Sequence, residues 1–402
     1  MRYVRMKVNV LIILVLFSMV LIAGCTQKMP EDNEQATIEQ ENGYNLLINE
    51  KEEEEAKADL NRMMQSVADI YSKADKGIAL NAVVSDETMN KMQDVIKETR
   101  CPVTSMSVYS NMDNWKYVEN FLNDCKVGKS GSVVIYEIHF DGGIGRDKYI
   151  FDGKDIYVLS TSAIWNKENK PENIYTTYTR IQEWEYTDKG WFCYQLCVPE
   201  PPEVSEVVDG SCMLRIKPMK DEYREISKKC VLPLGYQGNN ILCSNWDADH
   251  MEDLDYNGLF EYLYRLKYNK KISDEEYQDG IPKEDFESLI MEYFPVTAEQ
   301  IRKYAEFDEE NQTYIWVRLG CLNYTPTYFG TSIPEVTDIK ENEDGTVTLT
   351  IDAVCEMVLC DEAVITHKLD IRLLEDGSFK YLGNEIQDNG ILNIPEYQHR
   401  IR

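Results

Sequence analysis

Six consecutive residues near the middle of the chain have the types and spacing of a calcium loop. The run 253–258, Asp-Leu-Asp-Tyr-Asn-Gly, has oxygen-bearing side chains at alternate positions and a glycine at the sixth, as in the first half of an EF-hand. The twelfth position should supply a bidentate glutamate and is Tyr264 instead. Asp253, Asp255 and Asn257 are therefore candidate calcium ligands, and the alternative is that they form the capped start of a helix.

A second set of residues could line a pocket. His367 falls on the apolar side of a predicted strand, where a histidine is either a hydrogen-bonded core residue or, on a concave sheet, part of a pocket. Tyr236 and Asn239 belong to the segment 235–240, Gly-Tyr-Gln-Gly-Asn-Asn, whose glycines and amides suit either ligand contact or a tight turn. We treat His367, Tyr236 and Asn239 as pocket candidates.

The chain has 11 cysteines. Cys355 and Cys360 flank a predicted turn between two strands and are candidates for a disulfide, although pairing cannot be derived from one sequence. No C-x₂-C pair occurs in the sequence, which argues against a zinc site built from cysteines. The other thiols have an equally simple interpretation as buried apolar side chains.

Hydrophobic periodicity predicts the elements that must position these residues. In two regions, 59–205 and 206–402, apolar residues first recur at helical spacing and then alternate as they do in strands. The proline-rich run 199–203 separates the two regions. We expect an α+β fold of two lobes, each with helices followed by an antiparallel sheet, similar in kind to the cone-shaped nuclear-transport-factor-two-like or cystatin-like folds.

The first 24 residues are predicted to be a signal peptide. Arg2, Arg5 and Lys7 precede an apolar run, residues 8–22, whose length suits a secretory signal better than a membrane span. Its end, Leu-Ile-Ala-Gly-Cys, resembles the lipobox of bacterial lipoproteins, which implies cleavage before Cys25 and lipid attachment, such as palmitate, at that cysteine. The alternatives are a retained membrane anchor and an ordinary cleaved signal.

The segment that follows predicts a spacer between membrane and lobes. Residues 25–58 are rich in acidic and amide side chains, and only residues 44–48 form an apolar island, which we expect to dock onto the next domain. The formal net charge of the chain is −29, so nucleic-acid backbones and anionic bilayer surfaces are repelled. We therefore expect a lipid-anchored protein on the outer face of the cell membrane that binds no nucleic acid.

Along most of its length the chain resembles an uncharacterised family of lipoproteins from clostridial Gram-positive bacteria. The resemblance rests on the lipobox and on four further segments, which are Gly-Trp-Phe at 190–192, Pro-Glu-Pro-Pro at 199–202, the segment 235–240, and Asp-Gly-Ser-Phe-Lys-Tyr at 376–381. The resemblance implies export to the cell envelope. It implies no reaction, because that family has no known activity.

The sequence contains none of the common catalytic or nucleotide-binding motifs, namely H-E-x-x-H, G-x-S-x-G, Walker A and the dinucleotide fingerprint. We therefore expect a non-catalytic module that binds a protein, peptide or glycan, with calcium as the sole candidate cofactor. Two alternatives remain. A solute-binding lipoprotein of a transporter should alternate strands and helices around a cleft, and a carboxylate-based hydrolase needs two facing acids in a deep pocket.

Overall fold

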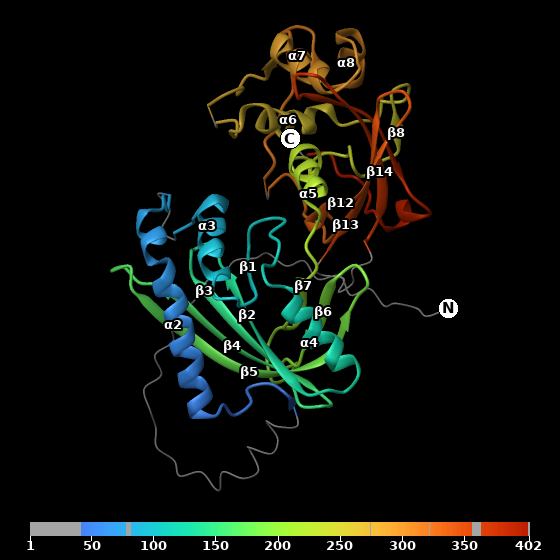
Figure 1. The fold of residues 1–402 in the computed structure, drawn as a ribbon. Helices are drawn as coiled ribbons and strands as arrows, with labels where there is room; N and C mark the ends of the chain where they lie inside the picture. Colours follow the sequence, from blue (N-terminus) through green and yellow to red (C-terminus); the bar gives the residue numbers. More distant parts are fainter. Residues whose placement is uncertain (1–41, 78–81, 274, 321, 356–362, 401–402) are drawn as a thin grey trace.

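The protein consists of two lobes, each with helices packed on a β-sheet (Figure 1). The structure is a computed structural model that describes residues 42–77, 82–273, 275–320, 322–355 and 363–400. It confirms the predicted α+β class with two lobes. Within these ranges no helix combines the length and the apolar character needed to cross a membrane. The likeness to cone-shaped folds stays a prediction.

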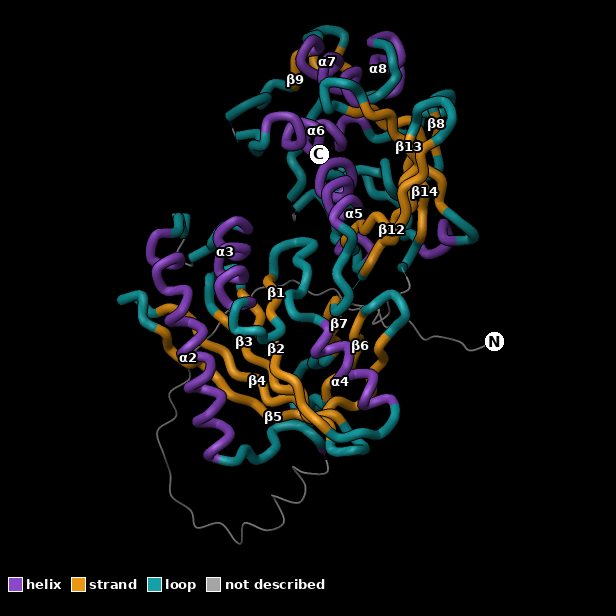
Figure 2. The backbone as a smooth tube through the Cα atoms, viewed as in Figure 1, coloured by secondary structure: helices purple, strands orange, loops and turns teal. Residues whose placement is uncertain are grey.

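A curled seven-stranded sheet forms the first lobe (Figure 2). Its strands follow the order β1-β2-β3-β4-β5-β6-β7, and all neighbours are antiparallel except the short β1, which runs parallel to β2. The elements of this lobe are α2 (Glu50–Lys73), α3 (Asp86–Lys97), β1 (Val103–Ser105), α4 (Lys116–Lys126), β2 (Gly131–Ile138), β3 (Ile144–Phe151), β4 (Ile156–Trp165), β5 (Pro171–Tyr186), β6 (Trp191–Leu196) and β7 (Ser211–Arg215).

Helices cover both faces of this sheet. Alternate residues of a strand point to opposite faces, and β2 uses both. Tyr136 and Ile138 belong to the core beneath α2 and α3, whereas Ile135 packs with Val118 and Leu122 of α4. The first lobe therefore contains two separate apolar cores, one on each side of the sheet.

The long helix α2 begins inside the segment predicted to be a spacer. The side chain of Asn49 accepts hydrogen bonds from the amides of Lys51 and Glu52, and glutamates occupy the first turn, where they interact favourably with the positive end of the helix. Leu60 and Met64 of the same helix are fully buried. The acidic run is thus helical from residue 50, because the cap and the buried stripe outweigh its self-repulsion.

The apolar island before α2 docks on the sheet, as the sequence predicted. The amide of Leu46 donates to the carbonyl of Tyr178 at 3.0 Å, and the amide of Arg180 donates to the carbonyl of Gly43 at 2.7 Å. Residues 43–46 therefore lie along β5.

The first lobe also extends past the predicted boundary at residue 205. Strand β7 pairs with β6, for example Cys212 with Tyr194, so the proline-rich run 199–203 connects two neighbouring strands of one sheet. The chain leaves the first lobe after Arg215.

The second lobe packs its helices on a five-stranded antiparallel sheet in the order β12-β13-β14-β15-β8. A small three-stranded sheet, β10-β11-β9, lies beside the helices. The elements are α5 (Asp221–Ile226), a π-helical turn (Ser227–Val231), β8 (Trp246–Asp247), α6 (Tyr256–Tyr268), β9 (Ile281–Pro282), α7 (Lys283–Tyr293), α8 (Ala298–Tyr304), β10 (Phe307–Asp308), β11 (Thr313–Tyr314), β12 (Ile333–Glu341), β13 (Val347–Val354), β14 (Thr366–Leu373), β15 (Phe379–Ile386), and 3₁₀ turns at Phe329–Thr331 and Gly390–Asn393.

Two carboxylates of the second lobe face two cations of the first. Glu335 on β12 and Asp352 on β13 are direct cross-strand partners and are 8% and 7% exposed. Arg215 of β7 pairs with Glu335, and Lys189 Nζ lies 3.1 Å from Asp352 Oδ2. Burial raises the pKa of Glu335 even though Arg215 acts to lower it. Because adjacent like charges repel, these cations stabilise the junction between the lobes.

Replacing Arg215 with Met should therefore lower the free energy of unfolding by about 3–5 kcal/mol, because Glu335 is left buried without its cation. Urea denaturation measures the loss. The matched control is Lys217→Met, two residues away, whose ion pair with Glu119 is 3.8 Å long and whose side chain is 40% exposed; its cost should stay below about 1 kcal/mol. Equal losses in the two variants would contradict the importance of the buried pair.

Candidate functional site

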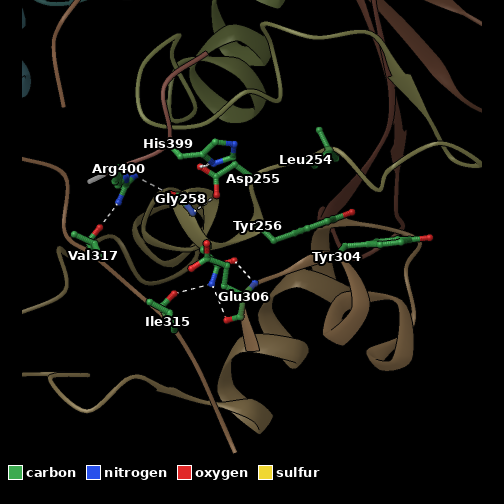
Figure 3. A pocket seen from close by; sticks show the side chains of 11 residues that line it. Leu254, Asp255, Tyr256, Gly258, Tyr304, Glu306, Ile315, Val317, His399 and Arg400 are labelled. Atoms are coloured by element: carbon green, nitrogen blue, oxygen red, sulfur yellow. Dashed lines mark hydrogen bonds and ion pairs between the residues drawn. The ribbon is translucent and has the colours of Figure 1, made fainter. Parts of the chain in front are cut away.

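A cavity of about 230 Å³ opens at the N-terminus of α6 in the second lobe (Figure 3). Its walls come from the start of α6, from the end of α8 and the residues around β10 and β11, and from the C-terminal segment. The lining residues are Leu254, Asp255, Tyr256, Asn257, Gly258, Tyr304, Glu306, Ile315, Val317, His399 and Arg400.

The carboxylate of Asp255 connects two of these walls, the start of α6 and the C-terminal segment. Its Oδ1 accepts the amide hydrogen bond of Gly258 at 2.8 Å and so caps α6. Its Oδ2 accepts the hydroxyl of Tyr397 at 2.6 Å and lies 3.6 Å from His399 Nδ1. The amide of Asp255 in turn donates to Asn240 Oδ1 at 2.9 Å. Burial and the neighbouring Asp255 raise the pKa of Tyr397, which keeps its hydroxyl protonated as a donor.

Arg400 fixes the C-terminal segment against α6. Its side chain is only 5% exposed. Nη1 donates to Glu261 Oε2 and to the carbonyl of Val317, both at 2.8 Å, and Nη2 donates to the carbonyls of Gly238 and Gly258, both at 2.9 Å. The guanidinium thus uses all four of its Nη–H donors within the protein.

The opposite wall is held by an amide and two aromatic rings. Asn257 Nδ2 donates to the carbonyls of Ile315, at 2.6 Å, and Glu306, at 3.2 Å, while its Oδ1 accepts the amide of Glu306 at 2.9 Å. The rings of Tyr256 and Tyr304 are nearly parallel, 6.5 Å apart with an interplanar angle of 15°. In Figure 3 the two side chains point in the same direction, away from Asp255 and His399.

Of the three calcium candidates, Asp255 and Asn257 line this cavity, whereas Asp253 is exposed and does not. Helix α6 begins at Tyr256, so the remainder of the predicted loop is helical. In the part of the chain that the structure describes, no group of three or more His, Cys, Asp or Glu side chains is placed to hold a metal ion. The observed arrangement is the capped helix start, and calcium binding stays a prediction.

The structure brings two of the pocket candidates together in the core. Tyr236 and His367, 131 residues apart, form a 2.9 Å hydrogen bond. Asn384 donates its amide to the carbonyl of Ser244, so its Oδ1 accepts from His367 Nδ1 at 2.6 Å, and Nε2 accepts from Tyr236. His367 is fully buried, and burial lowers its pKa to about 4. The imidazole is therefore neutral at physiological pH.

Asn239 serves a turn. It donates to the carbonyl of Leu234 and accepts the amide of Ile241. Tyr236 also borders a second cavity of only about 20 Å³ beneath Pro395 and Tyr397, which is room for roughly one water molecule. Of the three pocket candidates, Tyr236 thus lies closest to open space.

The cysteine predictions fall largely outside the described residues. Cys355 is buried, with its Sγ 3.5 Å from the carbonyl of Tyr328 and 3.8 Å from Thr331 Oγ1. Cys360 and the lipid-attachment residue Cys25 both lie outside the described ranges. The disulfide and the anchor therefore stay predictions.

Sequence reasoning missed most of the cavity. Glu306, His399 and Arg400 showed no motif, because they meet Asp255 only through the tertiary fold. The hydrogen bond from Tyr397 to Asp255 spans 142 residues. The one available signal was the cap pattern at 255–258, which indicated where α6 begins and not what packs against it.

The chain matches, over residues 53–400, a family described as a family of unknown function (DUF6070). It belongs to this family. The DUF6070 match covers most of both lobes, including the residues that line the cavity. No curated protein and no solved structure matches the chain. Membership of DUF6070 assigns no reaction, and the expected lipoprotein character and clostridial origin stay predictions.

The buried imidazole makes stability depend on pH. His367 has a pKa of about 4 in the fold and about 6.5 when unfolded, so only the unfolded chain takes up this proton between those values. Stability should fall as pH drops from about 6.5 to about 4, by about 3 kcal/mol from this residue.

Urea denaturation at pH 7 and pH 4.5 tests the contribution of His367 to this pH dependence by comparing the native protein with His367→Gln. The variant is expected to be less stable at pH 7 but to lose less stability on acidification. An equal loss in both proteins, or an imidazole that titrates above pH 6 by NMR, would show that His367 does not remain neutral.

Proposed function

We propose that the protein is a lipoprotein held at the outer face of the cell membrane through Cys25, and that it is a binding module whose ligand enters the cavity at α6. The observation that carries the binding half of this proposal is the cavity itself, which is walled by charged and aromatic side chains fixed in position. Ligand sites are typically concave, with a few polar groups held in place on an otherwise apolar lining.

The anchor rests on the sequence. The basic tip, the apolar run and the residues before Cys25 have the order of a lipoprotein signal, and the chain resembles clostridial lipoproteins. Several acyl chains on one cysteine give stable attachment, at about 0.8 kcal/mol per buried methylene. The acidic residues that follow the cysteine would keep the lobes away from an anionic bilayer.

The hydrogen bonds that the cavity's side chains already make within the protein favour binding over catalysis. The carboxylate of Asp255 is used as a helix cap, the amide of Asn257 holds two backbone segments, and the Nη donors of Arg400 are all engaged. Serine, threonine, cysteine and lysine do not occur among the residues that line the cavity. Groups held in this way recognise a ligand by their fixed positions instead of exchanging protons with it.

A carboxylate-based hydrolase is the second candidate, because Asp255 and Glu306 line the same cavity. In such enzymes one carboxyl group donates a proton while the other acts as base or nucleophile. The role of Asp255 as a cap requires it to remain an acceptor, which supports the binding module instead. A transporter solute-binding protein receives less support, since neither lobe alternates strands and helices around a cleft.

Metabolic labelling with a palmitate analogue tests the proposal directly. The full chain expressed in a Gram-positive host should incorporate the label and be released from intact cells by added protease. Cys25→Ala should abolish labelling, whereas Cys101→Ala, a partly exposed thiol of the first lobe, should leave it unchanged. An unlabelled native protein, or labelling that survives Cys25→Ala, would refute the anchor.

A further inference from the structure

Asp255 carries a buried negative charge with weak compensation. Its side chain is 8% exposed, yet the nearest basic side chain, the imidazole of His399, lies 3.6 Å away and is itself 76% exposed. The other partners of the carboxylate are the amide of Gly258 at the positive end of α6 and the hydroxyl of Tyr397, and neither carries a full charge. A buried carboxylate is costly unless a positive charge balances it. The cavity therefore presents a carboxylate whose charge a cationic ligand would balance better than the protein does.

The other charged residues that line the cavity do not make its net charge positive. Glu306 is also acidic but has an interaction of its own within the protein, so the negative character of the cavity rests on Asp255. The positive charge of Arg400 is balanced by Glu261 at 2.8 Å, and its Nη groups donate to protein acceptors. The chain as a whole carries a formal charge of −29. A negative potential is focused in a cleft with low-dielectric walls, so cations are favoured in this cavity.

The rest of the wall suits an organic cation. The partly buried ring of Tyr304, which packs against the fully buried Tyr256, offers aromatic surface, and Ile315 and Val317 offer aliphatic surface. An ammonium group near an aromatic face gains about 0.5–2 kcal/mol from the ring quadrupole. A bare inorganic ion would gain nothing from this apolar surface. The cavity volume of about 230 Å³ corresponds to about seven water molecules, which limits the ligand to a short aliphatic chain.

We infer that the cavity at α6 binds an alkylammonium group, meaning a primary amine on a short aliphatic chain, with the nitrogen at Asp255 and the chain against Tyr304. This inference rests on the proposed binding function and names its ligand class. The same chemistry is available from a free diamine and from a lysine side chain of a partner protein. Both sources carry the charge and the aliphatic stem that the walls fit.

Isothermal titration of the full-length protein with size-matched probes tests the inference. The probes are 1,4-diaminobutane, its neutral analogue 1,4-butanediol, the dianion succinate, calcium chloride, and Nα-acetyl-lysine methylamide, all at constant ionic strength. The diamine should bind and the diol and succinate should not. Binding of the lysine derivative as tightly as the diamine would indicate a protein lysine as the natural source, and weaker binding would indicate a free amine.

Variants locate the binding. Asp255→Asn keeps a side chain that caps helices well but removes the charge, and it should weaken diamine binding at least about tenfold. Asp253→Asn is the matched control: it removes the same charge two residues away, outside the cavity, and should leave the affinity unchanged. Tyr304→Leu tests the aromatic contact and Glu306→Gln tests the other acidic residue of the lining, and they keep the test decisive if Asp255→Asn fails to fold.

The outcomes separate this inference from the proposed function. Binding of the diol or succinate in preference to the diamine, lost in Tyr304→Leu, would overturn the ammonium class while leaving the cavity as a binding site. Calcium binding that Asp255→Asn abolishes, without diamine binding, would also overturn it. Diamine binding that is insensitive to Asp255, Glu306 and Tyr304 would refute the cavity as the ammonium site, while the anchor is judged separately by labelling at Cys25.

Discussion

The second lobe depends on one residue, Asp255, whose buried carboxylate and backbone amide connect three segments of the chain. Asp255 caps α6 through Gly258, accepts a hydrogen bond from Tyr397 in the C-terminal segment, and is held in turn by Asn240. A charge in this position is costly unless its partners stay in place. The three segments are thereby kept at a fixed separation, and the cavity lies where they meet.

Buried arginines perform the corresponding task at other junctions. Arg146 joins the first sheet to Asp59 of α2, Arg215 joins the two lobes through Glu335, and Arg400 joins the C-terminal segment to Glu261 of α6. In a chain with 42 basic and 71 acidic residues, carboxylates are plentiful and cations are few. The cavity at α6 shows the same use of cations, because the one arginine that lines it is already paired with Glu261.

Local patterns in the sequence predicted the elements well because local physics forms them. The stripe containing Leu60 and Met64 indicated α2, and the cap pattern at 255–258 indicated the start of α6. The run of glutamates before residue 58 was misleading, since a cap at Asn49 and favourable charge at a helix N-terminus outweigh repulsion among side chains. The proline-rich run 199–203 also suggested a boundary between the lobes. It connects two strands of one sheet instead, because the residues that follow it form β7 and pair with β6.

The site could be predicted only in part, since its residues meet through long-range packing. Nothing in the spacing of Tyr236 and His367 indicated that they share a hydrogen bond, and nothing near Asp255 in the sequence pointed to Tyr397, His399 or Arg400. Chemical type gave the candidates, but burial decided their roles. His367 is a neutral core residue for this reason, while Asp255 faces a cavity.

The central claim is that the cavity at α6 binds an organic ammonium ion through Asp255, and a crystal structure of the protein with 1,4-diaminobutane tests it most directly. The account predicts one amine nitrogen within hydrogen-bonding distance of Asp255 Oδ2, with the aliphatic chain lying against Tyr304. A diamine bound elsewhere on the protein, with the cavity at α6 filled by water alone, would contradict it.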